Sequence, residues 1–313
     1  MSTLPYPVKG LVAATFTPMQ EDGSIRPETI PAVVEHLLAN GIVGLYVLGS
    51  TGEGLSLTQD ERCAVAEAFV QASAGRLPVI IQVGNECLTE ARHLASHAQE
   101  IGADAVSAVS PVYFKPDSAE ALVDSMAEIA AGAPDLPFYY YHIPQLTGVE
   151  ARMVDFLRLG GERIPTLRGI KFTSPDVEDF RATRELAADR FDILWGLDEL
   201  LIHGLTAGAT GAVGSTYNFA APIYHRVLAA FAAGDLEEAR RQQARSQSLV
   251  DTFVPYGHRQ AQKAILAMVG PDCGPTRLPI RPLPSSQAEA LRKDLEAIDF
   301  FSWVAPGQAQ PVS

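Results

Sequence analysis

The sequence predicts an α/β fold, namely a (β/α)8 TIM barrel with a C-terminal helical extension. Short runs of β-branched and aromatic residues alternate with amphipathic stretches at a regular interval. Several of these runs are apolar throughout, which is typical of parallel strands that are covered on both faces. Eight strand–helix units fit into residues 1–235, and eight such units close a barrel. A doubly wound open sheet is the alternative, because the number of strands does not distinguish the two folds.

The expected strands are short and follow one another through the first two thirds of the chain, at residues 11–16, 44–48, 79–83, 105–109, 138–141, 167–172, 192–195 and 211–214. Helical periodicity predicts helices at 27–40, 58–74, 88–101, 118–131 and 176–188. Thr58 and Ser118 each stand where a helix N-cap is expected. Glu61 completes a capping box with Thr58, whereas Ala121 cannot do so with Ser118.

Residues 236–313 form the expected extension, packed on the barrel as part of the same single domain. Helices are expected at 236–253, 259–269 and 287–298, and the proline-rich stretch 271–284 is expected to run extended over the surface. No low-complexity segment and no flexible linker interrupts the sequence. One domain is therefore the simplest organisation.

The composition argues against several classes of partner. The net charge of −13 would repel a phosphate backbone, so no nucleic acid is expected. No apolar run approaches the roughly 18 residues of a membrane span, and the first residues lack the pattern of a secretion signal, so no membrane association is expected. The cysteines, Cys63, Cys87 and Cys273, are scattered without a CxxC pair. That spacing predicts reduced thiols and a cytoplasmic location.

Lys171 stands out among the five lysines because it lies in a short apolar run, Gly169-Ile170-Lys171-Phe172, that is typical of a buried strand. The other four, Lys263 among them, lie in loops or polar helical stretches where an ammonium group is expected to stay in water. Burial of an ammonium is costly unless the group is paired or loses its proton. A fall of its pKa by ~3 units, to near neutrality, costs ~4 kcal/mol. A neutral lysine is a nucleophile, so Lys171 indicates covalent chemistry; a lysine that reaches out from a strand edge is the alternative.

The carboxyl ends of barrel strands carry the active site, and the turn after the second expected strand is rich in glycine and hydroxyl groups. Its sequence is Gly49-Ser50-Thr51-Gly52-Glu53-Gly54. Backbone N–H groups and the hydroxyls of Ser50 and Thr51 are suited to hold a small anion there. A tight strand-to-helix turn without a ligand is the alternative. The turn lacks the Gly-Lys-Ser/Thr ending of a P-loop, which disfavours a nucleotide.

The fifth expected strand ends in three successive tyrosines. Tyr139 and Tyr141 share one face of the strand, and Tyr140 points the other way. Tyr141 is nearest the carboxyl end and is best placed to reach a ligand, although packing of all three against helices would also explain them. On the next strand, Thr173 shares a face with Lys171.

The last two expected strands are followed by further polar positions, Gly196, Asp198 and Glu199 after the seventh and Ser215 after the eighth. Carboxylates accept hydroxyl hydrogens, which suits a ligand with several hydroxyl groups. Capping of the next helix is the alternative role of the two acids.

One pair of histidines has a spacing suited to a metal site. His93 and His97 are four residues apart, a spacing at which both can bind one ion on the same face of a helix. That helix is expected in the outer ring of the barrel, and the other histidines form no cluster with cysteines or carboxylates. A solvated histidine pair is therefore the preferred interpretation, and no metal is expected.

Taken together, the turn 49–53, Tyr141 and Lys171 thirty residues later resemble the dihydrodipicolinate synthase / N-acetylneuraminate lyase superfamily. The resemblance extends from about residue 10 to residue 283 and is specific in combination. It is closest to the animal type of the lyase branch in the stretches 10–15, 136–148 and 209–218.

The resemblance implies a class I aldolase that cleaves N-acetylneuraminate (sialic acid) to N-acetylmannosamine and pyruvate, with no metal or organic cofactor. Lys171 would form the Schiff base and Tyr141 would move the proton of the substrate hydroxyl. Ser50 and Thr51 would bind the α-keto carboxylate. The resemblance also implies a homotetramer, with Tyr113 as an aromatic residue near the site that meets the neighbouring subunit. The sugar tail would be held by Thr173, Gly196, Asp198, Glu199 and Ser215.

One departure separates the sequence from the dihydrodipicolinate synthases. Where those enzymes carry an arginine that grips a second substrate carboxylate, this sequence has Leu146. A role in lysine biosynthesis is therefore disfavoured, and Asp198 and Glu199 would also repel a dicarboxylate. Another 2-keto-3-deoxy sugar acid aldolase or dehydratase stays open as the alternative. A barrel that binds a keto acid without catalysis is disfavoured, because both Lys171 and Tyr141 are present.

Overall fold

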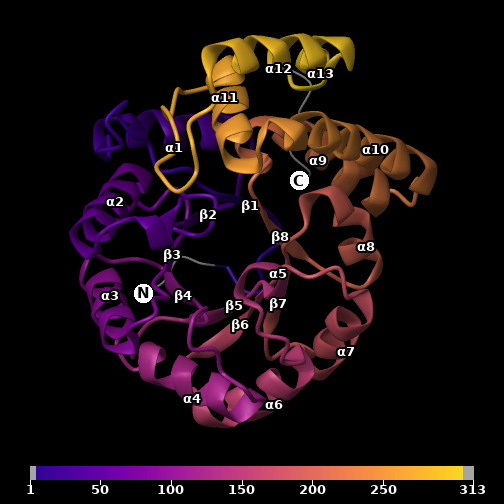
Figure 1. The fold of residues 1–313 in the computed structure, drawn as a ribbon. Helices are drawn as coiled ribbons and strands as arrows, with labels where there is room; N and C mark the ends of the chain where they lie inside the picture. Colours follow the sequence, from indigo (N-terminus) through magenta and orange to yellow (C-terminus); the bar gives the residue numbers. More distant parts are fainter. Residues whose placement is uncertain (1–4, 306–313) are drawn as a thin grey trace.

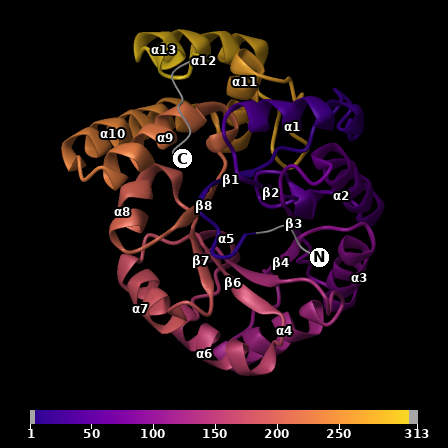
Figure 2. The same cartoon turned by 180° about the vertical axis from the view of Figure 1, so that it is seen from behind.

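The computed structural model describes residues 5–305 and contains the predicted barrel. Eight parallel strands pair in sequence order, and β8 closes the barrel beside β1. Figure 1 and Figure 2 show this ring from its two opposite ends, with the helices outside it. The expected strands agree with the observed ones to within two residues at either end. The strands are β1 (Gly10–Ala14), β2 (Gly44–Val47), β3 (Val79–Gln82), β4 (Ala105–Val109), β5 (Phe138–His142), β6 (Leu167–Phe172), β7 (Asp192–Trp195) and β8 (Gly211–Gly214).

The helices that follow the strands include the five that the sequence predicts. The capping box is confirmed, because Thr58 Oγ1 accepts from Glu61 N at 3.2 Å and Thr58 N donates to Glu61 Oε2 at 2.9 Å. Ser118 caps its helix alone, accepting from Ala121 N at 3.1 Å. The helices are α1 (Ile30–Ala39), α2 (Gln59–Ser73), α3 (Leu88–Glu100), α4 (Ala119–Ala130), α5 (Pro144–Thr147), α6 (Met153–Arg163), α7 (Val177–Ala187), α8 (Leu201–Thr206) and α9 (Tyr217–Ala232).

Alternate strand residues enter two different apolar clusters, one inside the barrel and one between barrel and helices. The three tyrosines of β5 illustrate this. Tyr139 and Tyr141 belong to the inner cluster, whereas Tyr140 faces outward and packs on Phe156 of α6, with ring centroids 4.6 Å apart. The predicted alternation is confirmed, and it leaves Tyr141 at the carboxyl end of the barrel interior.

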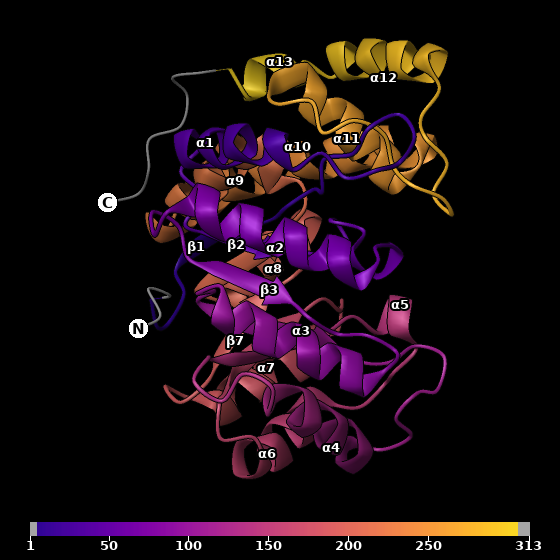
Figure 3. The same cartoon turned by 90° about the vertical axis from the view of Figure 1, so that its left-hand side faces the viewer.

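The C-terminal extension consists of α10 (Leu236–Phe253), α11 (His258–Val269), α12 (Ser285–Ala297) and α13 (Phe300–Trp303). These helices lie on one side of the barrel, next to α1 and α9 (Figures 1 and 3). Buried Gln243 of α10 accepts a hydrogen bond from Ile202 N at 2.9 Å and donates one to the backbone oxygen of Asp198 at 3.2 Å. The extension therefore supports the segment that follows β7.

The stretch 271–284 has no helix or strand, as expected, but it does not simply run over the surface. Cys273 and Thr276 are buried, and Cys273 O accepts a hydrogen bond from Met19 N at 3.0 Å. The expectation of an exposed path was wrong at these positions, because the segment packs into the loops that follow β1 and β2. Among residues 5–305, no helix is long and apolar enough to cross a membrane.

Asp192 is a buried carboxylate at the amino end of β7. Its Oδ2 accepts from Val8 N at 2.9 Å, two residues before β1, and from the Tyr139 hydroxyl at 3.4 Å inside the barrel. Burial raises the pKa of this carboxyl to about 6, although both hydrogen bonds favour the charged form. The group therefore links β7 with β5 and with the segment before β1, at the end of the barrel opposite to the strand carboxyl ends.

We predict that Asp192 makes the stability of the fold depend on pH. Its folded-state pKa of about 6 lies above the ordinary value of 3.8. Protonation therefore adds roughly 3 kcal/mol to the free energy of unfolding, a contribution complete below the unfolded pKa and lost as the pH rises through the folded one. Asp192→Asn should flatten the difference in urea midpoint between pH 4 and pH 7.5, while exposed Asp117→Asn should not. An unchanged pH dependence in Asp192→Asn would contradict the prediction.

Candidate active site

The carboxyl ends of the strands surround a cavity of about 490 Å³. Figure 3 shows the barrel from the side, and α5 lies at the end toward which the β3 arrow points. A more open depression of about 570 Å³ lies between α10 and α12, away from the strand ends. The barrel cavity is the candidate active site, since nine of the ten expected site residues line it. These are Ser50, Thr51, Tyr141, Lys171, Thr173, Gly196, Asp198, Glu199 and Ser215.

Lys171 lies on the inner face of β6 and is 4% exposed. The register of the barrel pairs it with Tyr141 of β5. Its Nζ lies 4.0 Å from the ring centroids of both Tyr46 and Tyr141. Burial lowers the pKa of Lys171, and the Tyr141 hydroxyl and the carboxylate of Asp198 oppose this shift. The lysine is therefore biased toward the neutral, nucleophilic form.

Tyr141 connects the lysine with the glycine-rich turn. Its ring packs edge to face on Tyr46, with centroids 5.6 Å apart. Its hydroxyl oxygen lies 3.3 Å from Ser50 Oγ. A group that can pass a proton thus lies between the nucleophile and the turn expected to bind a carboxylate.

Asp198 is held in place by residues at the end of β8 and directly after it. Its Oδ2 accepts from the backbone N of Thr216 at 2.8 Å and from Thr216 Oγ1 at 2.7 Å. A Cβ at Gly214 would lie 2.0 Å from Asp198 Oδ1, so this close approach requires glycine. Burial raises the pKa of Asp198 to about 6, and the charge of Glu199 adds to the shift. Asp198 therefore has a structural task in addition to any contact with a ligand.

The other polar groups on this side of the cavity have fewer protein partners than Asp198 and are therefore more available to a ligand. The Glu199 carboxylate makes no hydrogen bond or ion pair with any residue in the described range 5–305. Thr173 Oγ1 is buried, and no hydrogen-bond partner for it occurs in that range either. Gly196 lies against Thr173, since a Cβ there would be 2.1 Å from that hydroxyl oxygen. Ser215 Oγ accepts from Gln262 Nε2 at 3.0 Å and keeps its own hydrogen to donate.

Three residues of the site were missed by the sequence analysis: Tyr46, Arg259 and Gln262. Tyr46 lies in an expected strand, and the alternation along that strand would have directed it inward. Its hydroxyl is 2.9 Å from Ser107 Oγ, and its ring is one of the two against Lys171. Arg259 and Gln262 lie in α11 and line the cavity. No local pattern in the sequence connects α11 with the strand ends.

Tyr113 is the one expected site residue that does not line the cavity. It is 79% exposed and packs edge to face on exposed Phe114, with ring centroids 4.9 Å apart. The carboxylate of Glu86 accepts hydrogen bonds from its backbone N and from that of Val112. Its expected contact with a neighbouring subunit stays a prediction.

The expectation that the remaining lysines lie in water is wrong for Lys263. This side chain of α11 is 2% exposed. Its Nζ lies 3.4 Å from Glu53 Oε1 and donates to Pro275 O at 2.6 Å. The polar residues around Lys263 do not indicate this burial, because its partner carboxylate comes from the turn after β2, more than 200 residues earlier in the sequence.

The two histidines of α3 have separate surroundings. His97 Nε2 lies 2.9 Å from Glu67 Oε1, and His93 is exposed. Within the described part of the chain, no group of three or more histidine, cysteine or acidic side chains is arranged to hold a metal ion.

An eight-stranded barrel with a buried lysine and a tyrosine on adjacent strands, at the carboxyl ends, is suited to chemistry through an imine on the lysine. The chain belongs to the dihydrodipicolinate synthetase family, which matches residues 7–298. It is 40% identical to the N-acetylneuraminate lyase of Mus musculus over 98% of this chain and 97% of that protein. The enzyme of the same name from Homo sapiens is 41% identical over 95% and 94%. The structure of Proteus mirabilis N-acetylneuraminate lyase matches with a TM-score of 0.91 and 38% identity, covering 94% of this chain and 99% of that one.

We predict that the charge of Arg259 contributes to the pH range of activity, in addition to the burial of Lys171. Arg259 is among the groups that lower the pKa of Lys171, because a nearby cation disfavours the ammonium form. Arg259→Gln removes that charge, so the pKa of Lys171 should rise and the acidic limb of the kcat/KM profile should move to higher pH. Asp198→Asn should move the limb the opposite way. Exposed Arg240→Gln serves as the control, and an unmoved limb in Arg259→Gln would refute the prediction.

Proposed function

We propose that this protein is a class I aldolase that cleaves N-acetylneuraminate to N-acetylmannosamine and pyruvate. The observation that carries the proposal is the buried Lys171, in contact with the rings of Tyr46 and Tyr141, in a cavity with hydroxyl groups at one side and free Glu199 at the other. The identity of about 40% to N-acetylneuraminate lyases over nearly the whole chain supports the choice of substrate.

The reaction begins with the neutral amine of Lys171. It attacks the keto carbon of the open-chain sugar acid, and the resulting carbinolamine loses water to give a protonated imine. The imine accepts the electron pair of the carbon–carbon bond that breaks, two bonds away. The lowered pKa of Lys171 supports this step, since only the unprotonated amine attacks.

Cleavage requires removal of a proton from the hydroxyl on the carbon that is released. Tyr141 passes this proton on, helped by the carboxylate of the substrate itself. The carbon–oxygen double bond of the amino sugar forms as the carbon–carbon bond breaks, and the electron pair moves into an enamine on Lys171. Protonation of the enamine carbon and hydrolysis then release pyruvate. These steps need neither a metal ion nor an organic cofactor.

The two ends of the substrate meet different parts of the cavity. We assign the carboxylate to Ser50 and Thr51 and the hydroxylated tail to the opposite side. Leu146 of α5 lines the cavity where a cationic grip for a second carboxylate would be needed. This apolar side chain supports a substrate with one carboxylate instead of a dicarboxylate. The tail is assigned to Thr173, Gly196, Asp198, Glu199 and Ser215.

We further propose that the enzyme is a cytoplasmic homotetramer. Exposed Tyr113 and Phe114 offer apolar area for a subunit contact, and Cys63, Cys87 and Cys273 are free thiols. Light scattering of the purified protein tests the assembly, and a monomeric mass would overturn it.

The imine predicts a covalent adduct between the protein and pyruvate. Borohydride added with pyruvate should reduce the imine and leave a stable modification on Lys171, seen by peptide mass spectrometry. Lys171→Ala should lose the adduct and lower kcat by at least about 10³-fold, because the covalent route is removed. Lys115→Ala on the surface is the control. Full lyase activity in Lys171→Ala would disprove the mechanism.

The tail assignment predicts that Glu199 and Asp198 differ in the effect of substitution. Glu199→Gln removes a charged acceptor for sugar hydroxyls, so KM for N-acetylneuraminate should rise by roughly tenfold to a hundredfold. The fold should keep its stability, since no protein partner of Glu199 occurs among the described residues. Asp198→Ala should in addition lower the urea midpoint, because the backbone N and Oγ1 of Thr216 lose their acceptor. Unchanged KM for N-acetylneuraminate in Glu199→Gln would remove that residue from the tail site.

The alternative substrates are tested by comparing pyruvate release from N-acetylneuraminate with pyruvate release from 2-keto-3-deoxygluconate.

A further inference from the structure

The turn that carries Ser50 and Thr51 has a demanding backbone. Glu53 adopts a left-handed conformation, with φ of 54°, and a Cβ at Gly54 would lie 1.9 Å from Leu48 O. Glu53 N donates to Ser50 O at 3.3 Å, and Thr17 Oγ1 donates to Gly52 O at 2.7 Å. A non-glycine residue at positive φ is costly unless its surroundings hold it. The contacts around Glu53 therefore bear directly on the position of Ser50 and Thr51.

The Glu53 side chain is buried and bound entirely by the C-terminal part of the chain. Its Oε2 accepts from Arg277 N at 3.0 Å. Its Oε1 makes no hydrogen bond within the described range, and its contact there is the ion pair with Lys263 Nζ at 3.4 Å. Burial lowers the pKa of Lys263, and the charge of Glu53 opposes that shift. Removal of Lys263 would leave a buried carboxylate uncompensated.

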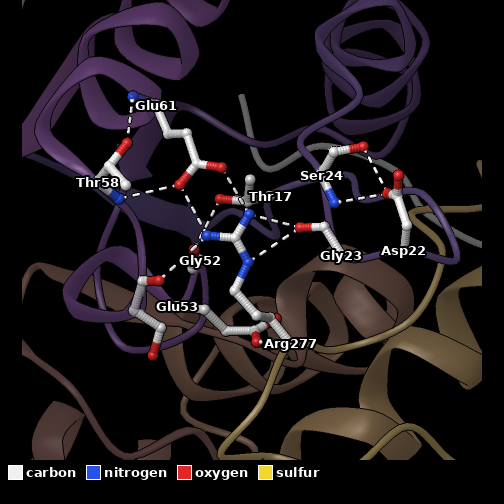
Figure 4. A network of polar contacts seen from close by, with 10 residues as sticks. Thr17, Asp22, Gly23, Ser24, Gly52, Glu53, Thr58, Glu61 and Arg277 are labelled. Atoms are coloured by element: carbon white, nitrogen blue, oxygen red, sulfur yellow. Dashed lines mark hydrogen bonds and ion pairs between the residues drawn. The ribbon is translucent and has the colours of Figure 1, made fainter.

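Arg277 fixes the far end of the same turn (Figure 4). Its guanidinium binds both oxygens of Glu61, with Nη1 at 2.7 Å from Oε2 and Nη2 at 2.6 Å from Oε1. It also donates from Nε to Gly23 O at 2.9 Å and from Nη1 to Ser56 O at 3.2 Å. Glu61 is the capping-box residue of α2. The turn is therefore held at Glu53 and again at the start of the helix that follows it.

None of Glu53, Lys263 and Arg277 lines the cavity, and the reaction does not use them. We propose that they are positioning residues, which fix the turn so that Ser50 and Thr51 bind the carboxylate of the 2-oxo acid. The C-terminal extension thereby sets the affinity for the pyruvate half of the substrate. This inference rests on the proposed function and assigns a task to a buried ion pair that the chemistry leaves unused.

Different contacts support the two halves of the substrate, so loss of one set of contacts should affect one half only. The tail side rests on Thr216 and Gln243, which bind the carboxylate and the backbone of Asp198. Loss of the Glu53–Lys263 pair should move the turn and leave that side in place. A general loss of stability would instead weaken both halves together.

The test measures the two substrates separately in the direction of synthesis, with Lys263→Met. KM for pyruvate should rise by roughly tenfold or more, as expected when a buried charge is left unpaired. KM for N-acetylmannosamine should stay within about twofold of wild type. The pyruvate concentration that half-saturates borohydride trapping should rise in parallel with KM for pyruvate. The double variant Glu53→Gln/Lys263→Met should recover part of the loss, since neither charge is then unpaired.

Asp192→Asn is the matched control, because Asp192 is also a buried carboxylate but lies at the opposite end of the barrel. Both KM values should be unchanged in it. If Lys263→Met does not fold, Arg277→Lys keeps the charge, loses the two-pronged grip on Glu61 and should show the same selective rise. Equal rises in both KM values, or an unchanged KM for pyruvate in a folded variant, would overturn the inference.

The result that would contradict the proposed function differs from those that would overturn the positioning role. A wild-type protein that binds pyruvate covalently but does not cleave N-acetylneuraminate would remove the substrate assignment. The pyruvate concentration that half-saturates borohydride trapping can then still be measured for Lys263→Met and for wild type. A selective shift there would support the positioning role without reference to the sugar, and no shift would overturn it.

Discussion

The site depends on the burial of one amine between two aromatic rings. Lys171 Nζ is 4.0 Å from the centroids of Tyr46 and Tyr141, and the residue is only 4% exposed. Aromatic faces stabilise a cation, while burial disfavours it more strongly, and the lowered pKa is the net result. The same rings restrict where the amine can lie. In the proposed mechanism, reactivity and direction of attack thus come from one packing arrangement.

The sequence was sufficient for the barrel, because each strand is a short apolar run and each helix has its own periodicity. It was also sufficient for the residues at the ends of those strands, since the carboxyl ends of parallel strands in a barrel meet at one face. Lys171, Tyr141 and the turn around Ser50 were predicted in this way, and they line one cavity. Their chemical roles stay predictions.

The residues that the sequence concealed are those brought in by long-range packing. Lys263 looks like a solvated helix residue until Glu53 is placed beside it, and Arg259 has no local feature that directs it to the strand ends. Such positions depend on how α11 lies against the barrel. That docking is a property of the whole fold, so neither periodicity nor a local motif can reveal it.

Separate parts of the extension support the two halves of the cavity. Gln243 of α10 donates a hydrogen bond to the backbone oxygen of Asp198, and Lys263 of α11 forms an ion pair with Glu53. Under the proposed function, a substitution in one of these supports changes the fit of one end of the ligand while the other end keeps its fit. The proposal therefore allows new sugar acids to be accepted through changes near Gln243, with the contacts to the keto acid unchanged. Divergence of substrate range in such a barrel needs no change at the lysine.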